Sequence, residues 1–157
     1  KIAKDHIKID SFFGLLQHMI YPAGSHGQLG GKSSGLFLAD HILKDSGGSD
    51  LNFGKIKTPK TWYLTSDGLL SFMSYNNLEE VMEQKYKDIA QVRQEYPYVV
   101  HVFKNALFPP EMLKGITMAL DDFGEVPLVV RSSSLLEDRV GSVFAGKYKS
   151  LFIWRHK

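Results

Sequence analysis

The sequence contains no cysteine among its 157 residues. This absence excludes a disulfide framework, a zinc site built on thiolates and a cysteine nucleophile. A chain without cysteine fits a reducing compartment, so the expected location is the cytoplasm.

The sequence also lacks a large excess of charge of either sign. Its 19 basic and 17 acidic residues give no basic field of the kind that nucleic-acid binders show, so nucleic acid is not an expected partner. No apolar run approaches the roughly 20 residues needed to cross a bilayer, and the first ten residues lack the apolar core of a signal peptide. These features predict a soluble protein without a membrane partner. The apolar content of 43% suffices for one buried core or two small lobes.

Apolar periodicity predicts helices separated by short strands. The expected helices cover residues 7–21, 36–45, 66–75, 77–96 and 110–123, and the expected strands cover 60–65 and 126–131. Residues 98–108 fit either a helix or a strand. Strands separated by helices indicate an α/β or α+β domain, and no internal repeat interrupts this pattern.

Several residues mark where these elements should begin and end. Ser33 and Ser34 are candidate N-caps of the second helix, and a serine is the expected cap of the third. Residues 46–59 form an expected exposed connection. Pro97 is expected to end the fourth helix, while Pro110 should open the last helix at its first position, with Gly124 closing it.

The glycine-rich stretch from Gly24 to Gly35 contains "GGKS" and invites comparison with the phosphate-binding loop of P-loop NTPases. That loop requires a glycine five positions before Gly31, where this sequence has His26. The P-loop interpretation therefore fails. Glycines ahead of a helix still let backbone N–H groups approach an anion, which the helix dipole and a lysine also attract. Lys32 is thus a candidate phosphate ligand, and the alternative is an ordinary loop with a solvated lysine.

A second group of candidates follows the apolar run "VPLVVR", which predicts a buried strand that ends in Arg131. A guanidinium held by a strand suits forked recognition of phosphate oxygens. Three serines, Ser132 to Ser134, add hydroxyl donors, and Gly141 and Gly146 bracket "SVFA" in a backbone that could lie closely over a ligand. The alternative is a β-hairpin whose arginine makes a structural ion pair, and residue types alone leave both interpretations open.

The segment "VVRSSSLLEDRVGSVFAGKYKSLF" closely resembles the signature of the ATP-binding domain of the phosphoenolpyruvate synthase and pyruvate phosphate dikinase family. Three further segments, "LGGKSSGL", "IKTPKTWYLTSDGLLSF" and "FPPEMLKGI", resemble family segments and occur in the family's order. The resemblance spans residues 29–152. We therefore expect a family domain over residues 29–157, preceded by a helical segment, residues 1–28, of unknown role.

The resemblance implies an ATP-grasp type domain with a small mixed sheet flanked by helices. Such a domain binds ATP with Mg²⁺ and passes a phosphoryl group to a histidine on a separate swivelling domain, which hands it to pyruvate or, in relatives, to a glucan or an antibiotic. By correspondence, Lys32 and Arg131 would contact the ATP phosphates and carry the catalysis. Ser132 and Ser133 join them in the expected nucleotide site, and Gly146 and Ser150 would cover the nucleotide.

The sequence also departs from the family pattern. "SSLLED" replaces the commoner Ser-Ala-Thr-Ala-Glu-Asp, and "GKYKS" stands where many members have Gly-Gln-Gln-Asp-Thr. We assign Glu137 and Asp138 to shaping the turn rather than to metal binding. The expected metal ligands, the phosphohistidine domain and the pyruvate domain do not occur in this sequence, so we expect a fragment that is inactive alone. The alternatives are a degenerate, non-catalytic nucleotide-binding or docking module, and a dikinase branch whose acceptor is a glucan or a drug.

Overall fold

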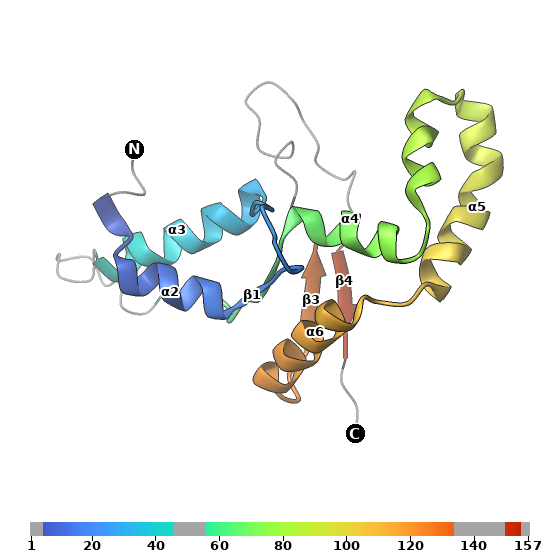
Figure 1. Ribbon diagram of the computed structural model, residues 1–157. Coiled ribbons are helices and arrows are strands. Elements are labelled where there is room, and N and C mark those ends of the chain that lie inside the picture. The colour runs from blue at the N-terminus through green and yellow to red at the C-terminus, as the bar shows by residue number, and fades with distance from the viewer. Residues whose placement is uncertain (1–4, 46–55, 134–149, 155–157) are drawn as a thin grey trace.

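The computed structural model describes residues 5–45, 56–133 and 150–154, and it confirms a mixed α/β fold (Figure 1). The elements run in the order α2 (Ile9–Gln17), β1 (Met19–Ile20), α3 (Gly31–Asp45), β2 (Tyr63–Leu64), α4 (Ser66–Tyr75), the 3-10 helix η3 (Glu79–Tyr86), α5 (Ile89–Asn105), α6 (Pro110–Phe123), β3 (Leu128–Arg131) and β4 (Ser150–Ile153). No helix in these ranges is long and apolar enough to span a membrane.

Two short sheets connect distant parts of the chain. Strand β1 pairs with β2 in parallel, with Met19 opposite Tyr63, and β3 pairs with β4 in antiparallel register. Helix α6 lies against β1, where Gly115 leaves room for the side chain of Ile20. Figure 1 shows α2 and α3 at one end of the molecule, the η3–α5 hairpin at the other, and α4 between them.

The buried core lies where α4 meets α6. Phe72, Met73 and Met112 form it, and Met112 is only 1% exposed. The ring of Phe72 also packs against Phe103 of α5, with the ring centroids 5.7 Å apart. This cluster joins three helices, so it holds α4 and the loop before it in place relative to the rest of the chain.

The first helix is shorter than the sequence predicted. Helix α2 ends at Gln17, and Met19 and Ile20 form a strand instead. Pairing with β2 explains the change, because the backbone N–H of Tyr63 donates to the carbonyl of His18 at 2.9 Å and that of Thr65 donates to Ile20 at 3.1 Å. Long-range pairing therefore overrides the local helical period.

The predicted N-caps were wrong for two helices. Helix α3 already begins at Gly31, so Ser33 and Ser34 lie within its first turn, and the N–H of Ser34 donates to the carbonyl of Gly30. Helix α4 has Thr65 at its N-cap position, one residue before the first serine. At the other end of the chain, α6 begins at Pro110 and ends before Gly124, whose φ is 69°, as the sequence predicted.

The predicted helix over residues 77–96 was also wrong, because it is divided in two. The 3-10 helix η3 ends at Tyr86, and α5 starts after Asp88, whose carboxylate accepts from the N–H groups of Ala90 and Gln91. Pro97 lies inside α5 and does not end it. Proline removes only one backbone donor, so the 17-residue helix continues past it to Asn105. Most of residues 98–108, which fitted either a helix or a strand, is therefore helical.

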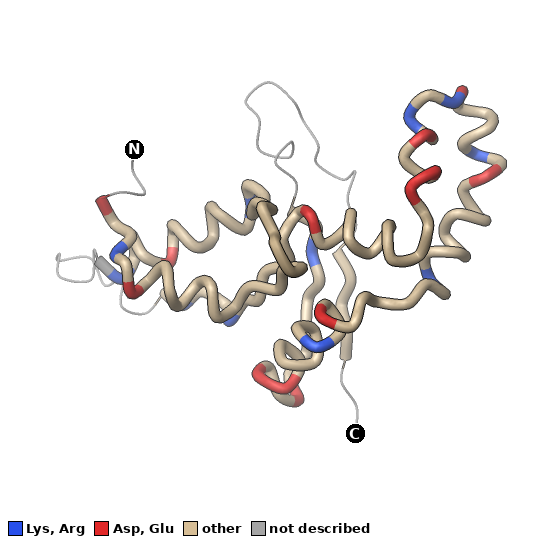
Figure 2. The backbone as a smooth tube through the Cα atoms, viewed as in Figure 1, with Lys and Arg blue, Asp and Glu red and all other residues tan. Residues whose placement is uncertain are grey.

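The η3–α5 hairpin is rich in charged residues, as Figure 2 shows by colour along the backbone. The ammonium of Lys87 lies 2.6 Å from the carboxylate of Glu95, and Gln84 donates to the same carboxylate. These bonds hold the pKa of Glu95 below its usual value. These bonds join the end of η3 to α5 on either side of Asp88.

Replacing Asp88 with alanine should lower the free energy of unfolding by about 1 kcal/mol. The carboxylate satisfies two backbone N–H groups at the start of α5, at 2.8 and 3.0 Å, and alanine leaves both without this acceptor. Urea unfolding followed by circular dichroism measures the change. Asp121→Ala, an exposed position near the end of α6, is the control and should stay within about 0.5 kcal/mol. Equal stability of the two variants would show that the cap contributes nothing.

The strand that carries Arg131 forms where the sequence predicted it, but it is not buried. Val129 and Val130 are each 51% exposed, and their neighbours on β4, Leu151 and Phe152, are 59% and 74% exposed. The apolar run was interpreted as buried because it is continuous. In the described part of the chain, a two-stranded ribbon cannot cover both of its own faces.

Candidate functional site

Lys32 lies in the first turn of α3, and its side chain is exposed. The helix begins at Gly31, directly after the glycine-rich loop, so backbone N–H groups of its first turn point out of the amino end. A lysine at this end adds a full positive charge to the partial positive charge of the helix dipole. This arrangement suits an anion.

Arg131 is the last residue of β3 and is exposed. Its register partner on β4 is Ser150, so two of the predicted site residues lie opposite one another on neighbouring strands. Ser132 follows directly and is partly buried. The antiparallel pair of β3 and β4 therefore carries this part of the candidate site.

Ser133 connects the two predicted parts of the site. Its hydroxyl accepts a hydrogen bond of 3.0 Å from the backbone N–H of Ser33, in the first turn of α3. Gly30 lies so close to the backbone carbonyl of Ser133 that a Cβ atom on Gly30 would overlap it. The residues next to Lys32 and those next to Arg131 are thus in direct contact, although about a hundred positions separate them. That Ser132 and Ser133 bind nucleotide stays a prediction.

The glycine-rich loop is also tied to the start of α4. The carboxylate of Asp67 accepts hydrogen bonds from the hydroxyl of Ser25 at 2.7 Å, from the backbone N–H of His26 at 3.1 Å and from the hydroxyl of Thr65 at 2.6 Å. Figure 1 shows the starts of α3 and α4 and the end of β3 gathered at the middle of the molecule. The glycine-rich loop therefore contacts α4 through Asp67 and the end of β3 through Ser133.

Two hydrogen bonds between Gln28 and Ser66 reinforce the attachment of the loop to α4. The N–H of Gln28 donates to the hydroxyl of Ser66 at 3.0 Å, and the N–H of Ser66 donates to the carbonyl of Gln28 at 3.1 Å. Asp67 was not among the residues predicted from the sequence. The signal that could have found it is the run Thr65-Ser66-Asp67, three side chains able to bond backbone N–H groups at the N-cap and in the first turn of a helix.

The hydrogen bonds to Asp67 also determine its ionisation. Burial by itself raises the pKa of this carboxyl group, but the hydroxyl donors of Thr65 and Ser25 outweigh burial and leave the pKa below its usual value. Asp67 is therefore ionised near neutral pH, and an ionised carboxylate is the form that can only accept hydrogen bonds. This is the form that the loop requires.

Gly146 lies outside the described residues, as do Ser134, Gly141, Glu137 and Asp138. Their predicted roles stay predictions. The described residues likewise hold no group of three or more His, Asp or Glu side chains that could bind a metal ion. We therefore assign no magnesium ligand to residues 5–45, 56–133 and 150–154.

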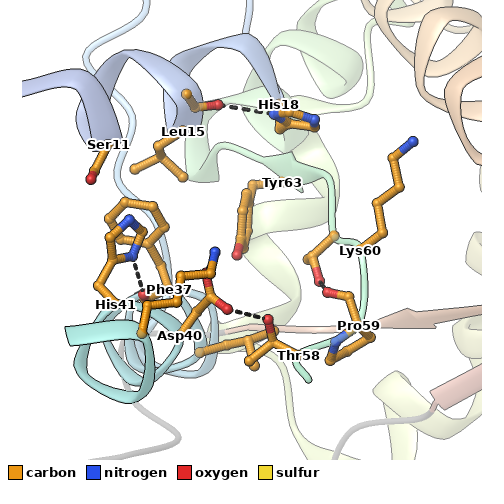
Figure 3. Close-up of a pocket in the computed structure, with 14 residues that line it drawn as sticks. Ser11, Leu15, His18, Phe37, Asp40, His41, Thr58, Pro59, Lys60 and Tyr63 are labelled. Atoms are coloured by element: carbon orange, nitrogen blue, oxygen red, sulfur yellow. Dashed lines mark hydrogen bonds and ion pairs between the residues drawn. The ribbon is translucent and has the colours of Figure 1, made fainter. Parts of the chain in front are cut away.

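A cavity of about 460 Å³ lies apart from this constellation, between α2, α3 and the segment before β2 (Figure 3). Asp40 accepts a hydrogen bond from Thr58 at its wall, and burial together with Asp40 raises the pKa of Tyr63. Both lysines that line it are already in ion pairs, Lys44 with Asp40 and Lys60 with Asp122. None of the predicted site residues lines this cavity, so we do not place the polyphosphate there.

The comparisons with known proteins agree with the resemblance seen in the sequence. The family model described as pyruvate phosphate dikinase, AMP/ATP-binding domain, matches residues 26–157. No curated protein and no solved structure matched the chain. The match covers most of the glycine-rich loop, from residue 26 on, together with Asp67 and the Arg131 strand. The chain therefore belongs to the pyruvate phosphate dikinase AMP/ATP-binding domain family.

Proposed function

We propose that this chain is the ATP-binding part of a phosphoenolpyruvate synthase-like dikinase, a phosphotransferase that passes a phosphoryl group from ATP to a histidine on another domain. The family match supports ATP binding and a kinase-type activity in general. The observation that carries the proposal is the contact of Ser33 and Gly30 with Ser133, because it brings the Lys32 helix and the Arg131 strand together.

The proposed grip combines three kinds of positive group. The amino end of α3 presents the partial positive charge of its helix dipole to the phosphates, Lys32 adds a point charge, and the guanidinium of Arg131 offers a fork of donors. Phosphoryl transfer depends mainly on positioning and charge stabilisation. Positive groups that hold the phosphates in place would provide both. Magnesium, when bound with ATP, would neutralise further phosphate charge, and we propose that residues other than the described ones hold it.

The remaining expectations are parts of the same proposal. Partners would be a swivelling phosphohistidine domain and a phosphoenolpyruvate/pyruvate domain, in the cytoplasm, with Gly146 and Ser150 covering the nucleotide. The division into residues 1–28 and 29–157 also stays a proposal. Strand β1 of the first segment pairs with β2 of the second, so the two segments share a sheet.

Calorimetric titration of ATP with Mg²⁺ tests the proposal, using both this chain and the complete gene product. We expect the complete gene product to bind, and the chain alone to bind more weakly, because the described residues offer phosphate contacts and no metal site. Absence of binding by both would contradict the proposal and favour the degenerate docking module.

Formation of phosphohistidine separates the enzyme from the degenerate module. After incubation of the complete gene product with ATP, the dikinase should carry an acid-labile phosphoryl group that mass spectrometry locates on a histidine. ATP binding without any such product would leave the nucleotide-binding module as the better interpretation. The final acceptor could be pyruvate, a glucan or a drug. Adding each of these to the phosphorylated protein and measuring the loss of its phosphoryl group identifies the acceptor.

A further inference from the structure

The attachment of the glycine-rich loop to α4 depends on one carboxylate. Asp67 uses both of its oxygens, Oδ2 for Ser25 and the N–H of His26, and Oδ1 for Thr65. The hydroxyl of Ser25 in turn accepts from the N–H of Gly27 at 3.1 Å. A chain of hydrogen bonds thus runs from α4 into three consecutive residues of the loop.

The loop and the carboxylate also fit one another sterically. A Cβ atom on Gly27 would overlap the carboxylate of Asp67 and lie 2.9 Å from the Cβ of Thr65. Only glycine lets the backbone approach α4 this closely. The loop then continues through Gly30, packed on Ser133, into the first turn of α3, where Lys32 lies.

We infer that Asp67 is a positioning residue for the phosphate-binding loop, one that fixes the backbone of residues 25–28 and thereby the place of Lys32, while its own oxygens remain engaged within the protein. This inference rests on the proposed function, because it concerns the same site. It adds a residue that neither the family signature nor the predicted site includes. Thr65 and Ser25 take part as the hydroxyl donors to the carboxylate.

The substitution that tests it is Asp67→Asn, which keeps the size of the side chain. The amide group has only one acceptor oxygen, so it cannot serve Thr65 on one side and the N–H of His26 on the other. We expect the amides of residues 25–28 to exchange with solvent about tenfold faster, measured by hydrogen exchange without nucleotide. In the complete gene product we expect ATP affinity to fall about three- to tenfold.

Asp88→Asn is the matched control. Asp88 also lies directly before a helix, but both of its hydrogen bonds go to one oxygen, Oδ1, so asparagine can keep both. It should leave loop exchange and ATP affinity unchanged. Asp88→Ala is the second control, because it lowers global stability at a site remote from the loop and should leave ATP affinity unchanged. The two controls separate positioning from a general loss of stability.

Ser25→Ala provides a milder variant in case Asp67→Asn does not fold. It removes one donor to the carboxylate and should change loop exchange in the same direction by a smaller factor. The effects of the two changes should be less than additive in the double variant, because both act on the hydrogen bonds of the same carboxylate. Additive effects would contradict a shared role.

The outcomes for the inference and for the proposed function are distinguishable. Unchanged loop exchange in both Asp67→Asn and Ser25→Ala would overturn the inference and leave ATP binding standing. Faster exchange with wild-type ATP affinity would also overturn it, because the loop would then not set the phosphate grip. If the wild-type protein does not bind ATP while Asp67→Asn exchanges faster, the proposed function fails and Asp67 remains an anchor of the loop.

Discussion

Replacing Gly30 with alanine should lower the free energy of unfolding by about 1–3 kcal/mol. The new Cβ would overlap the carbonyl carbon and oxygen of Ser133, which are backbone atoms and cannot turn aside as a flexible side chain could. Relief requires that α3 and the end of β3 move apart. Urea unfolding measures this cost directly.

The same substitution should weaken ATP binding by up to roughly a hundredfold, because a shift of about 1 Å in a positioned group has effects of this size. The start of α3 carries Lys32, and its contact with Ser133 holds it next to the Arg131 strand. Calorimetric titration of the complete gene product with ATP and Mg²⁺ is the measurement. Wild-type affinity in a folded Gly30→Ala protein would show that this contact does not set the site.

Gly35→Ala is the matched control for Gly30→Ala. Gly35 lies in α3, the helix that begins directly after Gly30, and a Cβ atom there would meet nothing within 4 Å. Alanine should therefore stabilise the helix by about 0.5–1 kcal/mol, because it loses less backbone entropy than glycine on folding. ATP affinity should not change. The two glycine substitutions should change the free energy of unfolding in opposite directions. This difference separates close packing at Gly30 from a general intolerance of side chains.

Removing either cation of the proposed grip should weaken ATP binding by about 1.5–3 kcal/mol. Lys32→Ala and Arg131→Ala each delete a charge-assisted contact to the polyphosphate, which corresponds to a loss of roughly 10- to 150-fold in affinity. The two residues come from different elements, α3 and β3, so the effect should appear in both variants independently. Calorimetry on the complete gene product, with circular dichroism to confirm folding, measures it.

Lys44→Ala is the control for these two variants. Lys44 lies in the last turn of α3, where it pairs with Asp40, so it shares the helix of Lys32 and faces the cavity instead. Its removal should leave ATP affinity unchanged. If Lys32→Ala and Arg131→Ala bind ATP like the wild-type protein while remaining folded, the assignment of the phosphate grip is wrong.

The elements that were predicted well are those whose ends are fixed by nearby residues. Pro110 and Gly124 bound α6 because proline fits a helix start and glycine adopts the positive φ that ends it. One element that was predicted poorly depends on a distant partner, because Met19 and Ile20 became a strand only through pairing with β2. The division between η3 and α5 has a local cause that the prediction overlooked, because the carboxylate of Asp88 caps a new helix through the N–H groups two and three residues further on.

The family, the mixed α/β class and a set of candidate phosphate-binding residues could be predicted from the sequence alone, because motifs and periodicity are local properties of the chain. The tertiary structure was needed to show that the Lys32 helix and the Arg131 strand meet at Ser133, and that Asp67 forms hydrogen bonds to the loop between them. It also showed that the apolar strand of Arg131 is exposed. These features are contacts between residues far apart in the chain, and a local pattern contains no information on which distant backbone will be its neighbour.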